Sequence, residues 1–415
     1  FTRKASTDIN YQACASLLLN NRNNIFPQFA THNAYSVAYI LERAGEDLTG
    51  FEFQRLHGMG EGLYDEIMTA QSIPVRIYAP VGEHKSLLAY LVRRLLENGA
   101  NSSFVNNIVD ESISLTELVE DPVKKIQNWS QITNPKIPLP IHIYGRNRLN
   151  SIGIDLTDID RLQQLSKIMM AWEKDNVIHN ITTPENAISS CNPTNNDEVL
   201  GSVSRTSIEQ LENKLDAANQ AYKDWSSISI KQRSDCLKLF GDKLEQHMDE
   251  FIALCTKEAG KIAVDGVAEV REAVDFCRYY ADQGEKVFSA HADWEQDGEL
   301  ESRGVVLCIS PWNFPLAIFV GQITAALAAG NSVLAKPADS TCLIASRAVE
   351  IMMECGFPKN MVQLILTPGK VVGENLLPGE RISAVMFTGS TGVGKWISQK
   401  LAERTGPRIP LIAET

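Results

Sequence analysis

The sequence has no apolar run long enough to cross a membrane. Its closest candidate, residues 315–330, is interrupted by Gln322 and Thr324, whereas a spanning helix needs about 18 or more uninterrupted apolar residues. We expect this stretch to form a buried helix against a sheet instead. An initiator Met and a signal sequence are also missing, and we interpret the chain as an internal fragment of a longer protein.

Positive charge and paired metal ligands are scarce as well. Lys and Arg number 39 against 51 Asp and Glu, which gives a net charge of −12. Because binding to a polyanion requires a clustered surplus of basic residues, we expect no nucleic-acid partner for this segment. The eight cysteines form no CxxC pair and no Cys/His spacing typical of metal ligands. This pattern favours reduced thiols in a cytosolic protein and predicts no metal site.

The first part of the chain repeats one phrase, a short apolar run that ends in polar or glycine residues and precedes an amphipathic stretch. The runs cover residues 26–33, 51–60 and 74–82, and they predict alternating strands and helices. In a (β/α)8 barrel, the residues at the carboxyl ends of the strands line one mouth. The candidates for that mouth are His32, Asn33, His57 and Tyr78. Three or four such units cannot close a barrel, so its first half is expected upstream of Phe1.

The composition changes twice after this region. Residues 111–160 are rich in acids and prolines, which predicts a connector. Apolar residues at helical spacing then predict helices over 206–225, 232–261 and 264–283. Finally, β-branched runs separated by helices predict a parallel sheet; they cover 304–315, 331–339, 361–369 and 382–390. The length and the 44% apolar content fit two or three domains.

A helical stretch at residues 90–99 carries two adjacent arginines. Tyr90, Arg93 and Glu97 lie three and four residues apart and therefore share one helix face. Two guanidinium forks, from Arg93 and Arg94, would suit the carboxylate of an amino acid. A solvated basic face paired with Glu97 explains the same residue types, and on those types alone both interpretations stay open.

Several motifs occur in order around these arginines. FATHNA, LHGMGE and IYAPVG are followed by HKSLLAYLVRRLLENGANSSFV, and together they resemble the proline dehydrogenase module of the proline utilization A family. The resemblance implies that residues 1–110 are the C-terminal part of a (β/α)8 proline dehydrogenase barrel that binds FAD. It implies contacts with proline from Leu56, Tyr78, Tyr90, Arg93 and Arg94. It also implies contacts with FAD from Thr2, Arg3, Lys4, Thr31, His32 and Asn33.

Four motifs in the last part resemble the aldehyde dehydrogenase superfamily in order and spacing. They are ISPWNFP (309–315), LAKPAD (334–339), FTGSTGVGK (387–395) and LIAET (411–415). Taken singly, Trp312 fits a core, Lys336 a surface charge and Glu414 the end of a strand. The resemblance implies that Asn313 donates to the oxyanion and that Glu414 is the catalytic base. It implies NAD contacts from Ile309, Trp312, Lys336, Phe387, Thr388, Gly389 and Ser390.

Four details qualify this second resemblance. Asp339 stands where the family commonly has Glu, which leaves the ribose contact and the choice between NAD and NADP open. Residues 161–415 are interpreted as the N-terminal part of the aldehyde dehydrogenase domain, with its Rossmann-like NAD-binding region, ending before the nucleophilic cysteine. Cys308 precedes ISPWNFP, but we expect it to be structural in a buried strand. GSTGVGK begins like a P-loop, but Trp396 replaces the hydroxyl residue that would bind magnesium.

Together the two resemblances imply an α/β chain with three parts, namely barrel, connector and Rossmann-like region. The parent would oxidise L-proline to pyrroline-5-carboxylate on FAD and glutamate semialdehyde to glutamate on NAD. A quinone acceptor, peripheral contact with the inner face of the membrane, a cytoplasmic location and a homo-oligomer are also expected, and the fragment alone is expected to be inactive. Three alternatives remain: a non-catalytic scaffold built from degenerate halves, an aldehyde dehydrogenase of other specificity with an unrelated extension, and a transcriptional regulator.

Overall fold

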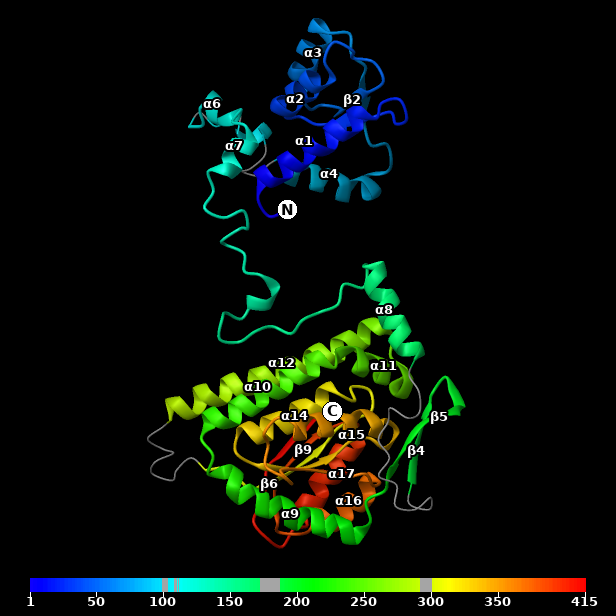
Figure 1. Ribbon diagram of the computed structural model, residues 1–415, viewed down its shortest axis with the longest axis vertical. Helices are drawn as coiled ribbons and strands as arrows, with labels where there is room; N and C mark the ends of the chain where they lie inside the picture. Colours follow the sequence, from blue (N-terminus) through cyan, green and yellow to red (C-terminus); the bar gives the residue numbers. More distant parts are fainter. Residues whose placement is uncertain (99–103, 108–109, 111, 172–186, 292–300) are drawn as a thin grey trace. The chain divides into compact units, whose positions relative to one another are not determined.

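The computed structural model describes residues 1–98, 104–107, 110, 112–171, 187–291 and 301–415. The chain divides into two compact units, Phe1–Pro138 and Leu139–Thr415 (Figure 1). The division falls inside the stretch that the sequence predicts as a connector. Among the described residues, no helix has both the length and the apolar character needed to cross a membrane.

The first unit contains three parallel strands that lie side by side in chain order (Figure 1). One helix connects the first strand to the second, and another connects the second strand to the third. The strands are β1 (Gln28–Ala30), β2 (Glu52–Leu56) and β3 (Val75–Tyr78). The helices are α1 (Lys4–Asn20), α2 (Ala34–Ala44), α3 (Glu61–Ala70), α4 (His84–Asn98), α5 (Phe104–Asn107), α6 (Leu115–Leu118) and α7 (Pro122–Gln127). The predicted alternation of strand and helix is confirmed. Phe29, Phe51, Phe53 and Tyr64 form its aromatic core, with neighbouring ring centroids 5.8–6.2 Å apart.

Glu52 joins all three strands at their amino ends. Its carboxylate accepts hydrogen bonds from Arg76 Nε at 2.6 Å and Arg76 Nη2 at 2.8 Å. It also accepts from Gln28 Nε2 at 2.7 Å and Gln54 Nε2 at 3.0 Å. These donors, Arg76 first, lower the pKa of Glu52 to about 2. The network fixes the register because the donors lie on β1, β2 and β3.

This network predicts a specific acid sensitivity. A depressed carboxylate pKa stabilises the fold above the unfolded pKa, about 4.5, and the stabilisation is lost as pH falls from there to about 2. We expect amide protection in β2 to fall over this window in the wild-type chain and to fall less steeply in Glu52→Gln. Hydrogen exchange followed by mass spectrometry measures this amide protection at each pH. Glu61→Gln is the control, because Glu61 is exposed and lies 3.7 Å from Arg55; equal profiles for wild type and Glu52→Gln would contradict the prediction.

The second unit begins with a short 3-10 helix, an α-helix and an antiparallel hairpin, and continues into four helices. These elements are η1 (Pro140–His142), α8 (Ile159–Met170), β4 (Ala187–Asn192), β5 (Asn195–Ser204), α9 (Ile208–Ser226), α10 (Ile230–Gln246), α11 (Met248–Ala259) and α12 (Ala263–Ala290). The stretch predicted to be helical over 232–261 forms two helices, because the structure ends one helix and begins another at His247. The apolar spacing continues across the break into the buried side chains Phe251 and Ile252, so periodicity alone did not reveal it.

A five-stranded parallel sheet follows, in the order β10-β9-β6-β7-β8. The strands are β6 (Val305–Ile309), β7 (Ser332–Lys336), β8 (Val362–Leu364), β9 (Ile382–Thr388) and β10 (Leu411–Glu414). The connecting helices are α14 (Ala317–Ala328), η4 (Asp339–Thr341), α15 (Cys342–Met353), α16 (Gly369–Leu376) and α17 (Thr391–Ala402). Helices cover both faces (Figure 1). Val306 and Cys308 pack on one side of the sheet, with α10, α12, α14 and α15, while Val305 and Leu307 pack on the other.

This order contains a reversal that determines where a ligand can bind. From β6 the chain runs outward through β7 and β8, and then returns to β9 on the other side of β6. In such doubly wound sheets, the connections leaving the two central strands diverge and leave a crevice at the carboxyl ends. The predicted Rossmann-like region is therefore confirmed, and the edge formed by the ends of β6 and β9 is where a site is expected.

Candidate functional site

A cavity of about 960 Å³ opens at this edge of the sheet. Residues from the ends of β6, β7, β9 and β10 line it. The structure thus brings together every residue that the sequence assigned to the NAD and catalytic sites: Ile309, Trp312, Asn313, Lys336, Phe387, Thr388, Gly389, Ser390 and Glu414. These residues span more than a hundred positions of sequence, and they meet because parallel strands end at one edge.

Lys336 ends β7 and supplies the cation of the cavity. Its Nζ donates to the Pro337 carbonyl at 2.7 Å and to Asp339 Oδ1 at 3.2 Å. The shorter Asp339 side chain therefore still reaches the lysine. An ammonium donor next to a carboxylate acceptor is a pair that a vicinal diol, such as a ribose, can satisfy with its two hydroxyls.

The turn between β9 and α17 presents a helix N-terminus to the cavity. Ser390 begins the helix, and its hydroxyl accepts from Val393 N at 3.4 Å. A side chain at Gly389 would place its Cβ 2.7 Å from the Phe387 ring, so this position requires glycine. Gly389 N donates to the Glu414 carbonyl at 3.1 Å, which ties the turn to β10. The positive end of the helix dipole at this turn suits a phosphate group.

An apolar pocket of about 310 Å³ adjoins the cavity and shares Ile309, Gly369 and Val393 with it. Trp396 forms one wall. A Cβ at Gly373 would lie 2.2 Å from the Trp396 ring, so glycine there allows the indole its position. In the sequence, Trp396 argues only against a P-loop, and this pocket was not predicted. The signal that was present is the pair of glycines four residues apart, Gly369 and Gly373, on one face of α16.

Gln322 is a second residue of the site that was not predicted from the sequence. It interrupts the apolar helix α14, and its Nε2 donates to the Ile309 carbonyl at 3.2 Å and to Thr388 Oγ1 at 3.1 Å. It therefore joins the carboxyl ends of β6 and β9, where the sheet order reverses. A polar residue within an otherwise apolar buried helix was the available signal.

The catalytic candidates and Cys308 occupy different environments. Asn313 is exposed in the loop between β6 and α14, and Glu414 is exposed at the end of β10; both line the cavity. Cys308 is 2% exposed within the core of the sheet, and burial raises the pKa of its thiol. Its structural role, expected from the sequence, agrees with this position, because a nucleophilic cysteine requires a lowered pKa and access to solvent.

In the first unit, five of the candidate residues lie at or just after the carboxyl ends of the parallel strands. Thr31, His32 and Asn33 follow β1, while Leu56 and Tyr78 are register partners at the ends of β2 and β3. Burial and the nearby Arg55 lower the pKa of His32. Among the described residues, its buried Nε2 has no hydrogen-bond partner. A neutral imidazole with a free ring nitrogen is thus available at the strand ends.

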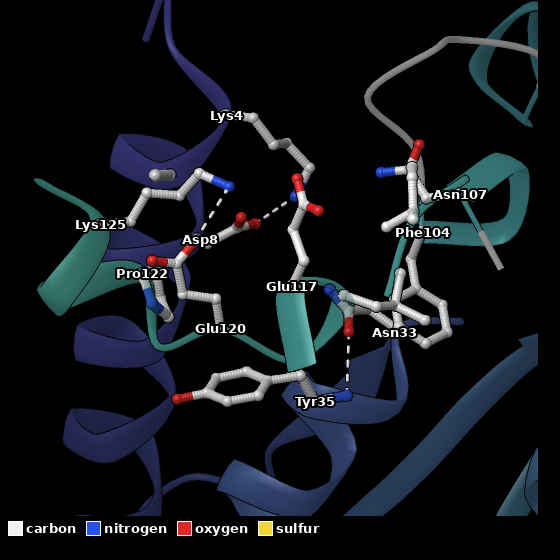
Figure 2. Close-up of a pocket in the computed structure, with 13 residues that line it drawn as sticks. Lys4, Asp8, Asn33, Tyr35, Phe104, Asn107, Glu117, Glu120, Pro122 and Lys125 are labelled. Carbon is white, nitrogen blue, oxygen red and sulfur yellow. Dashed lines mark hydrogen bonds and ion pairs between the residues drawn. The ribbon is translucent and has the colours of Figure 1, made fainter. Parts of the chain in front are cut away.

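Lys4 and Asn33 line a smaller cavity of about 160 Å³, shown in Figure 2, together with residues of α6 and α7. Lys4 pairs with Asp8, and the side-chain oxygen of Asn33 accepts from Tyr35 N at 2.9 Å. Thr2 and Arg3 instead contact a different part of the chain, residues 129–134. Arg3 lies 3.1 Å from the centroid of the Trp129 ring and donates to the Gln131 carbonyl at 2.8 Å, while the Thr2 carbonyl accepts from Asn134.

The two arginines of α4 differ in their surroundings. The Arg94 guanidinium lies 5.5 Å from the centroid of the Tyr90 ring, whereas Arg93 is exposed. The structure therefore pairs Tyr90 with Arg94, four residues on, rather than with Arg93. The Glu97 side chain, which the sequence placed on the same face, lies outside the described residues. An arginine stacked on an aromatic ring keeps its planar fork oriented for a carboxylate.

Two family models match the chain. Residues 1–107 match proline dehydrogenase, and residues 181–414 match the aldehyde dehydrogenase family. The Bifunctional protein PutA of Salmonella typhimurium is 45% identical over 437 aligned positions, which cover all of this chain and 32% of that relative. The 1-pyrroline-5-carboxylate dehydrogenase of Bacillus cytotoxicus is 37% identical over 227 positions, 53% of this chain and 44% of that protein.

A solved structure gives the same result. A mutant of the Bradyrhizobium japonicum proline utilization A (PutA) protein is 42% identical and superimposes with a TM-score of 0.85. The match covers all of this chain and 40% of that one. The chain thus spans about a third of the length of the curated PutA relatives it matches.

Proposed function

We propose a function on the premise that this chain belongs to the proline utilization A family and, through residues 181–414, to the aldehyde dehydrogenase family. The full-length protein carrying these residues would oxidise L-proline to pyrroline-5-carboxylate and glutamate semialdehyde to glutamate. The observation that carries the proposal is that all nine residues implied by the aldehyde dehydrogenase resemblance line the cavity at the ends of β6 and β9. The scaffold alternative is not favoured, because a degenerate site has no reason to keep this arrangement.

The residues of the second unit fit a dinucleotide. The cavity offers the Lys336–Asp339 pair for a ribose and the start of α17 for phosphates, and the adjoining Trp396 pocket offers flat apolar walls for a base. NAD, when bound, accepts the hydride of the aldehyde oxidation. We assign Lys336 and Asp339 to the adenosine ribose, Ser390 and Trp312 to the pyrophosphate, and Ile309 with Phe387, Thr388 and Gly389 to the walls around it.

The reacting aldehyde would meet Asn313 and Glu414. The side-chain amide of Asn313 donates a hydrogen bond to the oxyanion that forms when a thiolate adds to the carbonyl. The Glu414 carboxylate takes a proton from the water that later attacks the acyl carbon. None of the described cysteines lines the cavity, so we propose that the thiolate comes from a part of the protein outside this sequence.

The first unit would oxidise proline. A proline dehydrogenase module implies FAD, which supplies the hydride acceptor when bound. The free Nε2 of His32 at the strand ends fits a polar contact with a flavin. Thr2, Arg3, Lys4, Thr31 and Asn33 are proposed as further contacts. Arg93 and Arg94 would hold the carboxylate of proline, with Leu56, Tyr78 and Tyr90 around the ring.

Five finer assignments are also proposals. Electrons would pass from the flavin to a quinone, and the protein would contact the inner face of the membrane peripherally. It would otherwise be cytoplasmic, and it would form a homo-oligomer. The module boundaries are proposed at residues 1–110, 111–160 and 161–415.

One measurement tests both half-reactions. The full-length protein is given L-proline, NAD and a quinone analogue, and NADH is followed by its absorbance. Accumulating NADH would support both modules. NADH from supplied glutamate semialdehyde but not from proline would reject the proline oxidation alone, and no NADH from either substrate would reject the proposed function.

Asp339 provides a prediction about the nicotinamide cofactor. Its carboxylate, 3.2 Å from Lys336 Nζ, places negative charge where the 2′-phosphate of NADP would lie. We expect Asp339→Ser to raise kcat/KM for NADP relative to NAD by about 10-fold or more, because a like-charge contact is removed. Asp339→Glu, which keeps the charge, is the matched control and should retain the preference for NAD. An unchanged ratio in Asp339→Ser would contradict the assignment.

A further inference from the structure

Glu269 is a buried carboxylate that takes no part in the chemistry described above. It lies on α12, is 1% exposed, and does not line the cavity. Its Oε2 accepts hydrogen bonds from Leu316 N at 3.2 Å and Ala317 N at 2.9 Å. These amides begin α14, which has no cap from the side chain of Leu316 itself. The carboxylate therefore fixes the first turn of α14 to α12, at the positive end of its dipole.

Lys261 gives this carboxylate a partner and adds a second contact. The residue lies two positions before α12, and its Nζ lies 2.8 Å from Glu269 Oε1. The same ammonium lies 4.5 Å from the centroid of the Phe314 ring. A buried charge needs a countercharge, and an ammonium above an aromatic face is attracted to it. Lys261 thus contacts a side chain of residues 314–317, and Glu269 holds the backbone of the same segment.

Asn313 lies directly beside these contacts. Its side chain is exposed to the cavity and, in the described ranges, has no hydrogen-bond partner to orient it. The position of its amide therefore depends on the backbone of the loop between β6 and α14. Stabilisation of an oxyanion requires a donor that is already in place, and a displacement of about 1 Å can cost 100-fold in rate.

We propose that Lys261 and Glu269 are positioning residues that hold the loop so that the Asn313 amide meets the oxyanion. The inference rests on the proposed aldehyde oxidation. It differs from a purely structural role in one respect. If the pair acts by positioning Asn313, removing the pair should lower kcat only when Asn313 is present.

A double-mutant cycle in the full-length protein tests this dependence. We expect Glu269→Gln to lower kcat for glutamate semialdehyde by about 10- to 100-fold. In the Asn313→Ala background, the same change should lower kcat by less than about 2-fold, because the donor it positions is already absent. Lys261→Met should give the same pattern. The proposal would be overturned if the fold-decrease in kcat of each double variant equalled the product of the decreases in its two single variants.

Glu258 offers a matched control for burial and helix capping. It is 3% exposed and accepts from Leu343 N and Ile344 N, both at 2.9 Å, at the start of α15. Glu258→Gln therefore neutralises the same kind of carboxylate cap, but on a helix that does not line the cavity. We expect any loss it causes to be the same with and without Asn313. Coupling to Asn313 as strong as that of Glu269 would contradict the proposal.

Trp312 provides a readout that does not need activity. It precedes Asn313 and is 60% exposed. Acrylamide quenches the fluorescence of accessible tryptophans. The contribution of Trp312 is the difference in quenching between each protein and the same protein carrying Trp312→Phe. We expect Glu269→Gln and Lys261→Met to change this contribution and Glu258→Gln to leave it unchanged. A wild-type protein inactive on the aldehyde would reject the proposed function, whereas unchanged Trp312 quenching in both pair variants would reject the anchoring.

Discussion

Replacing Asn313 with Ala in the full-length protein should lower kcat for glutamate semialdehyde by about 100- to 1000-fold, the usual loss of one oxyanion donor. The side chain lines the cavity at the carboxyl end of β6 and is exposed there. Removing it leaves no buried group without a partner, so the fold should be unaffected. The loss should appear in kcat rather than in affinity for the aldehyde, because the donor acts on a charge that develops during the reaction.

Two further variants distinguish this role from a general disturbance of the loop. Asn313→Asp keeps the shape but presents oxygen atoms to the oxyanion, so it should be at least as inactive as Asn313→Ala. Asn375→Ala removes another asparagine, one on α16 that donates to the Val371 carbonyl at 2.8 Å. It should retain full activity. A kcat within about threefold of wild type for Asn313→Ala would reject the donor assignment.

The NAD-side residues were predicted through four motifs that resemble the aldehyde dehydrogenase superfamily, and each motif lies at the end of a predicted strand. Once 304–315 and 382–390 were interpreted as parallel strands, the residues after them had to share one edge of the sheet. Lys336, Asn313 and Ser390 therefore met in one cavity, although they are far apart in the chain. The strands and their common direction predict that these residues meet, whereas the role of each residue came from the resemblance to the aldehyde dehydrogenase motifs.

What the sequence did not reveal depends on contacts between elements distant in the chain. Lys261 and Glu269 hold α14 across about fifty residues. Gln322 joins two strand ends, and Trp396 fills the space left by Gly373. None of these contacts has a periodic signature, because each is made by a single side chain whose partner is set by tertiary packing.

The break at His247 has a different cause. The residue adopts φ −96° and ψ 18°, and the apolar residues on both sides of it face the same core. The hydrophobic pattern reports which side chains are buried, and burial continues through the bend. A change in helix direction therefore leaves the pattern intact when both helices pack on one cluster.

The first unit offers the sharpest test of the proline proposal, through the two arginines of α4. The Arg93 side chain is exposed, and Arg94 lies against the Tyr90 ring, with its guanidinium 5.5 Å from the ring centroid. A charge-assisted hydrogen bond contributes roughly 1.5–3 kcal/mol. Replacing both arginines with Met should therefore lower kcat/KM for proline by about 100- to 10,000-fold in the full-length protein.

The measurement is the rate of quinone-analogue reduction over a range of proline concentrations. Arg94→Lys separates charge from shape: if the planar fork binds the carboxylate, lysine should recover only a small part of the loss. Lys85→Met removes another exposed cation of α4, near its first turn, and should leave the apparent affinity for proline unchanged. NADH formation from glutamate semialdehyde should be normal in all three variants, because that reaction uses the other unit. An unchanged apparent affinity for proline in the double Met variant would reject the binding of the carboxylate by Arg93 and Arg94.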